Sequence, residues 1–149
     1  MSFRPGASPK SASRSPRPNT IFFDVGSLAT LQGRKFRPRT PEFGEAFETY
    51  LMHELICYRD YMSEEPLYYW RSTLGFEVDF IIGDHTAIEV KAKQNLSPAD
   101  LKSLNALAEE KRLKRYVCVS MEPHRRRIGD VIVLPYKEFL EELWGGGYA

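Results

Sequence analysis

The sequence is poor in cysteine and has no long apolar segment. Its two cysteines, Cys57 and Cys118, do not form a CxxC pair, and its three histidines show no ligand spacing, which argues against the common zinc motifs and redox pairs. The apolar runs are only a few residues long, whereas a membrane-spanning helix requires about 20. We therefore expect a cytoplasmic protein without a membrane span. With 149 residues, the chain is long enough for a hydrophobic core that needs no disulfide.

Acidic residues are absent from the first 18 positions, which carry four basic side chains and many Ser and Pro. The remainder contains 17 basic and 20 acidic residues, a net charge of −3. So polar a segment cannot bury enough apolar surface to fold, and its prolines forbid the amphipathic helix of a transit peptide. We expect residues 1–20 to be a disordered tail, with a weakly basic phosphate-seeking arm as the alternative, and residues 21–149 to be a single domain.

A glycine-rich phosphate loop is also missing. Residues 21–26 (IFFDVG) predict a short apolar strand, followed by a turn or short helical segment. Gly26 and Gly33 stand near basic residues, but their spacing is wrong and no Lys-Ser/Thr pair follows. An ATP site of the P-loop kind is therefore excluded.

The rest of the chain predicts strands and helices in alternation. Thr40 as N-cap and Pro41 at the first position open a helix that runs to about Tyr61. Ser97 and Pro98 open a second helix. The predicted strands cover residues 67–71, 76–82, 86–92, 115–120 and 130–135, and a last helix covers residues 136–144. The first three strands are joined as hairpins, so we expect a mixed sheet flanked by helices, of the α/β or α+β class.

Charged side chains alternate with apolar ones in the second and third of these strands. Simple alternation groups Phe76, Val78, Phe80 and Ile82 on one face and Glu77, Asp79 and Ile81 on the other. In the third strand, Glu89 and Lys91 share the face opposite the apolar residues. If residues 83–85 form a three-residue loop, Asp79 opposes Glu89 and Glu77 opposes Lys91.

Two opposed carboxylates suggest a metal site. Side chains directly opposite each other have Cβ atoms about 4.5–5.5 Å apart, so like charges there destabilise a sheet unless a cation lies between them. Mg²⁺ and Mn²⁺ are typically held by one or two carboxylates together with water and substrate phosphates. We therefore expect Asp79 and Glu89 to be metal ligands and Lys91 to act on an attacking water or on charge at phosphorus. The alternative is a solvated, salt-bridged sheet face.

A third metal ligand can come from the first predicted helix. Glu48 lies at the edge of its apolar arc, and Glu54 lies within it. A carboxylate that faces the sheet must find a partner, so either residue can complete the metal site or pair with Arg71 or a tyrosine hydroxyl.

Three segments together resemble a known family. GEAFETYLMHEL (44–55), YYWRSTLGFEVDFII (68–82) and AIEVKA (87–92) resemble the C-terminal domain of unknown function of many prokaryotic AAA-type ATPases. The segment from residue 21 resembles the sequence that precedes that domain. The domain is in turn similar to the PD-(D/E)XK nuclease superfamily. The resemblance implies an α/β fold with a restriction-endonuclease-like core, in which a mixed central sheet is flanked by helices.

The family resemblance assigns roles to four residues. Asp79 and Glu89 match the metal ligands and Lys91 the catalytic lysine, while Glu48 matches the helical glutamate of several resolvase-like members. Val78 stands where the name motif has proline. The implied function is a Mg²⁺- or Mn²⁺-dependent phosphodiesterase that acts on DNA. The alternative is a non-catalytic module that docks on or regulates an AAA-type ATPase, or that binds nucleic acid without cutting it.

Four arginines are candidate contacts to DNA phosphates: Arg71, Arg125, Arg126 and Arg127. A run of charge in a loop is more often simply solvated, and Arg71 can instead pair with Glu48 or Glu77. The charge of −3 on the body of the chain is unfavourable for tight binding of nucleic acid.

Overall fold

The computed structural model describes residues 13–16, 41–63 and 65–148. The strands are β1 (Ser13–Pro16), β2 (Leu67–Arg71), β3 (Glu77–Ile82), β4 (Thr86–Lys91), β5 (Arg115–Ser120), β6 (Arg126–Ile128) and β7 (Val131–Pro135). The helices are α2 (Pro41–Met62), the 3₁₀ turn η1 (Pro98–Leu101), α3 (Lys102–Ala108) and α4 (Tyr136–Trp144).

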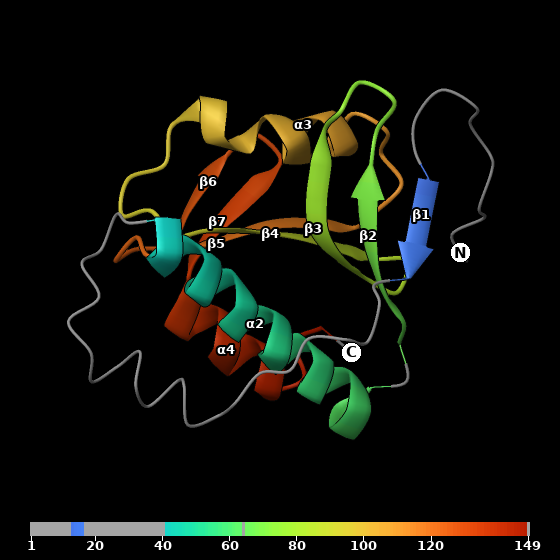
Figure 1. Ribbon diagram of the computed structural model, residues 1–149, viewed down its shortest axis with the longest axis vertical. Helices are drawn as coiled ribbons and strands as arrows, with labels where there is room; N and C mark the ends of the chain where they lie inside the picture. The colour runs from blue at the N-terminus through green and yellow to red at the C-terminus, as the bar shows by residue number, and fades with distance from the viewer. Residues whose placement is uncertain (1–12, 17–40, 64, 149) are drawn as a thin grey trace.

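These elements form three layers around one mixed sheet of order β1-β2-β3-β4-β5-β7-β6. Helices α2 and α4 cover one face, and η1 with α3 covers the other (Figure 1). The expectation of a mixed sheet flanked by helices is confirmed. Several sequence predictions, namely the strand at residues 21–26, the glycine segment at 26–33 and the Thr40 cap, lie outside the described residues.

Of the expected disordered tail, the structure describes only residues 13–16. They form β1, which pairs antiparallel with β2 at the edge of the sheet. At these four positions an extended, paired strand therefore stands where disorder was expected.

Helix α2 begins at Pro41, as its sequence predicts, and ends one residue beyond the predicted end. Its buried side chains include Phe47, Leu51, Leu55 and Tyr58, whose spacing of three or four residues places them on one stripe against the sheet. Each fully buried leucine contributes about 1.5–3 kcal/mol relative to exposure. No helix in the described part of the chain is long and apolar enough to cross a membrane, α2 included.

Strands β2, β3 and β4 form the predicted antiparallel meander. The turn between β3 and β4 contains Gly83 at φ +53°, a conformation that glycine adopts without steric cost. Ile82 pairs with Thr86, so the three-residue loop and the register that it implies at the turn are confirmed.

Strand β3 contains a β-bulge. Tyr68 pairs with Ile81, but Trp70, two residues further along β2, pairs with Val78, three residues back along β3. Two residues of β3 therefore oppose one residue of β2, which changes the phase of alternation within the strand.

The bulge corrects the face assignment made from the sequence. Val78 and Ile81 both lie in the core under α3, whereas Phe80 and Ile82 lie in the core under α2 and α4. The prediction that Val78 shares a face with Phe80 and Ile82 was wrong, because it assumed an unbroken period of two.

The other half of the sheet is mainly parallel. Helix α3 connects β4 to the parallel strand β5, and β5 pairs in parallel with β7. Lys91, Ser120 and Pro135 align at the carboxyl ends of these strands, the edge at which α/β sheets commonly bind ligands. Residues 126–128 were expected to lie in a loop, but they form the short edge strand β6, antiparallel to β7.

Candidate functional site

Asp79 lies in the bulge of β3, where its side chain bonds to the neighbouring strand. The backbone pairing of β3 with β4 extends from the turn to Phe80 opposite Ile88. One step beyond, the Oδ2 atom of Asp79 accepts a hydrogen bond of 2.8 Å from the backbone N–H of Val90. The bulge and this hydrogen bond hold the Asp79 carboxylate beside Val90 of β4, the residue that follows Glu89.

Glu89 is the buried charged group of the site, with 4% of its surface exposed. Its side chain lies on the α3 face of β4, because Ile88 and Val90 on either side belong to the core under α2 and α4. Lys91 Nζ lies 3.0 Å from Glu89 Oε1. Glu89 Oε2 is buried and has no hydrogen-bond partner. Of the alternative of a solvated, salt-bridged face, the salt bridge is therefore present at Glu89 but the solvation is not.

Burial also sets the protonation of these groups. It raises the pKa of Glu89 to about 7, against the opposing effect of Lys91, and the charges of Asp79 and Asp100 raise it further. Burial lowers the pKa of Lys91, but the Glu89 carboxylate outweighs this effect, so the pKa of Lys91 is raised and the amine stays charged. Cys118, paired in register with Glu89, is buried, and burial raises the pKa of its thiol.

The residues of this site fit a hard divalent cation. An unpartnered buried carboxylate oxygen is unusual, because buried polar atoms normally have hydrogen-bond partners, and it is a ligand atom that Mg²⁺ or Mn²⁺ accepts. Asp79 supplies a second carboxylate nearby. Within the described ranges, no three His, Cys, Asp or Glu side chains gather closely enough to hold a metal ion. Water or another non-protein ligand must therefore complete the coordination of an ion held here.

The two glutamates of α2 occupy different environments. Glu48 is half-buried on the helix that covers the face opposite α3, and the structure does not gather it with Asp79 and Glu89 into a group of three ligands among the described residues. The first turn of α2 nevertheless lies close to the end of β4. Gly44 is so near Ala92, the residue after β4, that a Cβ atom added to Gly44 would lie 3.9 Å from the Cβ atom of Ala92. Glu54 accepts a hydrogen bond of 2.8 Å from Trp144 Nε1 and links α2 to α4.

Three of the four arginines considered as DNA contacts form ion pairs within the chain. Arg71 pairs with the exposed Glu77 at 3.3 Å. Arg125 lies 3.0 Å from both Glu138 and Glu142 of α4. The remaining pair joins Arg126 to Glu122 at 2.7 Å, and Arg127 is exposed on β6.

Sequence reasoning missed a set of hydrogen bonds that holds the loop after β4, here called the clamp, formed by Glu122 and Arg126 with the backbone of Leu96. The buried Glu122 accepts hydrogen bonds from Leu96 N at 2.6 Å and from Arg126, which in turn donates to Leu96 O at 2.7 Å. The two contacts with Leu96 join residues 26 and 30 positions apart, so no local pattern signals them, whereas Glu122 and Arg126 are four positions apart.

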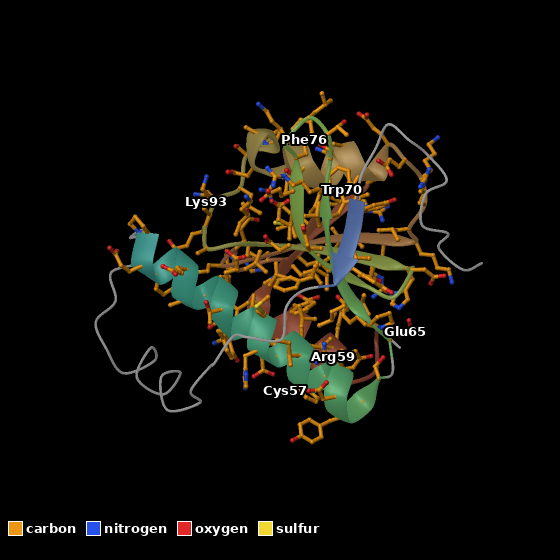
Figure 2. All side chains as sticks on the ribbon, turned by 45° about the vertical axis from the view of Figure 1, so that its right-hand side comes forward. Cys57, Arg59, Glu65, Trp70, Phe76 and Lys93 are labelled. Carbon is orange, nitrogen blue, oxygen red and sulfur yellow. The ribbon has the colours of Figure 1, made fainter. Side chains whose placement is uncertain are left out.

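A second contact of the same loop had a partial sequence signal. Asp100 caps η1 by accepting a hydrogen bond of 2.9 Å from Ser97 N, as the capping pattern suggests. Its other oxygen lies 2.5 Å from Lys93 Nζ. Lys93 lies on the side of the molecule where α2 begins (Figure 2).

Comparison with known proteins gives a family but no activity. The model of the domain of unknown function DUF4143 matches residues 43–139. Similar curated proteins include the uncharacterized proteins Rv2008c of Mycobacterium tuberculosis and Mb2031c of Mycobacterium bovis, each 27% identical over 122 residues. The alignment covers 78% of this chain but 26% of each relative, so the chain spans about a quarter of their length. No solved structure matches.

Proposed function

Because this chain belongs to the DUF4143 family of domains of unknown function, we propose its function from the site itself: a metal-dependent phosphodiesterase that acts on DNA. The observation that carries the proposal is the Glu89 carboxylate, buried with one oxygen on Lys91 and the other without a partner. A purely structural ion pair is expected to satisfy both oxygens, because a half-satisfied buried charge destabilises the fold.

The proposal includes a restriction-endonuclease-like, PD-(D/E)XK core. It is supported by an antiparallel meander that leads through a helical crossover into parallel strands. It is also supported by the placement of Asp79 on one strand and of Glu89 and Lys91 on the next.

In this proposal each residue has a separate task. Asp79 and Glu89 hold a Mg²⁺ or Mn²⁺ ion, which when bound polarises the scissile phosphate. Lys91, half-buried and charged, donates hydrogen bonds to the attacking water or to phosphate oxygens on which negative charge develops. The low polarity around Glu89 strengthens these interactions relative to water. The bond from Asp79 to Val90 fixes the carboxylate before substrate arrives.

The test is cleavage of supercoiled and branched DNA by the purified chain in Mn²⁺ and in Mg²⁺. We expect metal-dependent cleavage that falls by about a hundredfold or more in Lys91→Ala, Asp79→Asn and Glu89→Gln. Lys114→Ala is the matched control. Lys114 is exposed and directly precedes β5, so it lies at the amino ends of the parallel strands, whereas Lys91 lies at their carboxyl ends. Circular dichroism checks that every variant is folded. Cleavage that survives in Lys91→Ala overturns the assigned role of the lysine.

A second candidate function is a non-catalytic module that docks on an AAA-type ATPase or binds nucleic acid without cutting it. The engagement of Arg71, Arg125 and Arg126 by carboxylates of the same chain favours docking over DNA binding. The lining of a cleft of about 710 Å³ beyond β5 and β7 includes three carboxylates, from Glu122, Glu138 and Glu141, against the amine of Lys137, a balance that does not favour a phosphate backbone. The absence of both cleavage and a metal-induced rise in melting temperature in the wild-type chain would favour this function.

A further inference from the structure

Helix α2 carries a pair of metal-ligating side chains that the proposed nuclease site does not use. His53 and Cys57 lie one turn apart, with His53 Nε2 3.5 Å from Cys57 Sγ. Both side chains are half-buried. Cys57 lies on the C-terminal half of the helix, away from the end of α2 that packs on β4 (Figure 2).

We propose that His53 and Cys57 form a binding site for a thiophilic divalent cation such as Zn²⁺. Imidazole nitrogen and thiolate sulfur are the ligands that Zn²⁺ prefers, and residues four apart on a helix present their side chains on one face. The same spacing places paired histidines on zinc in helical metalloprotease motifs.

The separation of the two ligand atoms matches the requirement of the ion. Zn–S bonds of about 2.3 Å and Zn–N bonds of about 2.0–2.1 Å at a tetrahedral angle place sulfur and nitrogen about 3.5 Å apart. The structure holds them at 3.5 Å. Binding of an ion therefore requires the His53 ring to turn its Nε2 lone pair from the sulfur toward the ion, but it does not require the two ligand atoms to move apart.

The contact between the two side chains also defines the proton balance of binding. Either tautomer of His53 fits this contact, and in the one that is ready to bind an ion, Nε2 is unprotonated and accepts a hydrogen bond from the Cys57 thiol. When the ion binds, the S–H bond breaks, a sulfur–metal bond forms, and one proton leaves to solvent.

Acidic neighbours surround the pair. Asp60 lies seven residues beyond His53, on the same stripe of the helix, where it pairs with Arg59 at 2.9 Å. Burial, followed by the charges of Glu54 and Asp60, raises the pKa of the Cys57 thiol. A thiol in this environment is a poor nucleophile, but the same negative charges attract a cation.

Two protein ligands leave the remaining coordination positions open. Among the described residues no third His, Cys, Asp or Glu completes the group, so water or an incoming ligand must fill these positions. The site is therefore an exchangeable surface site, not a structural zinc site that the fold requires. The pattern His53-x₃-Cys57 is visible only when histidine and cysteine spacings are taken together.

The test is titration of the full chain with Co²⁺, which gives a thiolate-to-cobalt charge-transfer absorption band when it binds cysteine. We expect the band in the wild type and in Cys118→Ala, because Cys118 is buried under a different layer. Cys57→Ser should lose it, and His53→Gln should weaken Co²⁺ binding by about tenfold or more. Binding of either Co²⁺ or Zn²⁺ to the metal-free chain should release one proton per ion. Zn²⁺ should then displace bound Co²⁺ and abolish the band, whereas excess Mg²⁺ should not.

Three results would overturn the site: no band in the wild type, a band that persists in Cys57→Ser, or Co²⁺ affinity unchanged in His53→Gln. Circular dichroism checks that each variant is folded, and because both side chains are half-buried on a helix, we expect both substitutions to be tolerated. The oxygen ligands of Asp79 and Glu89 give no thiolate band, so this test is independent of the proposed nuclease function.

Discussion

The Asp79 carboxylate and the backbone N–H of Val90 are joined by a hydrogen bond of 2.8 Å, one step beyond the last backbone pair of β3 and β4. At this position the Asp79 side chain, in place of a backbone carbonyl, accepts the hydrogen bond that links β3 to β4. The residue that we propose as a metal ligand therefore also holds two central strands together, and its two roles can be separated by substitution.

Asp79→Asn should remove the metal response but preserve the fold. Asparagine keeps an acceptor oxygen for Val90, so we expect its free energy of unfolding to fall by less than about 1 kcal/mol, whereas Asp79→Ala loses about 1–3 kcal/mol. Both variants should lose the rise in melting temperature caused by Mn²⁺. Urea unfolding and thermal melts with and without Mn²⁺ measure these effects, and a full Mn²⁺ response in Asp79→Asn would contradict the ligand role.

The buried Glu89 should make the metal-free protein less stable as the pH rises. Its pKa is about 7 in the fold and 4.5 ordinarily, so the folded state binds the proton more tightly than the unfolded state. The contribution of this group is fully present below about pH 4.5 and is lost as the pH rises through about 7, a change of roughly 3 kcal/mol. Urea unfolding in EDTA across this range should show a decline in the wild type that is absent from Glu89→Gln. Parallel curves would contradict the assignment.

The clamp formed by Glu122 and Arg126 should give the opposite pH dependence to Glu89, with stability lost as the pH falls. Hydrogen bonds from Arg126, and from Leu96 N, lower the pKa of Glu122. Its stabilising contribution is therefore present above its ordinary acidic pKa and is lost as the pH falls. Glu122→Gln should cost about 1–3 kcal/mol at neutral pH and should flatten the acid side of the stability curve. The control Arg127→Ala, on the exposed β6, should stay within about 0.5 kcal/mol of the wild type.

The contact of α2 with the sheet should dominate the stability of the domain. Leu55 is fully buried, so Leu55→Ala should lower the free energy of unfolding by about 2–5 kcal/mol. Leu74, with 84% of its surface exposed in the turn after β2, provides a matched deletion that should change it by less than about 0.5 kcal/mol. Denaturant unfolding compares the two, and similar losses would show that α2 is not part of the cooperative core.

The local elements were predictable because their signals are local. Pro41 marks the start of α2, and α4 ends at Trp144, directly before a run of three glycines. The bulge was not predictable from the sequence. Phe80 continues an apolar alternation along β3, and this pattern does not indicate that β3 has one more residue than the part of β2 that it pairs with. Strand β6 was missed because two of its three residues are arginines and it pairs only with β7.

Part of the geometry of the candidate site was predictable, but not its environment, and the roles of its residues stay a prediction. Alternation along β4 places Glu89 and Lys91 on one face, and the structure places Lys91 3.0 Å from Glu89. The position of Asp79 in a bulge was not predictable from alternation. The burial of Glu89 depends on η1 and α3, which lie later in the chain. The partners of Arg125 likewise come from α4. Such contacts are set by tertiary packing, which strand periodicity does not report.

The bulge in β3 also constrains the length of that strand. Deleting either residue of the bulge would restore an unbroken ladder in which Val78 still pairs with Trp70 and Glu77 with Arg71. Deletion of Asp79 would remove the proposed metal ligand, and deletion of Phe80 would put Asp79 in its place, with a carboxylate in the core under α2 and α4. The turn at residues 73–75 is exposed and can change length without either effect. Insertions and deletions in this hairpin are therefore expected at the turn and not at the bulge.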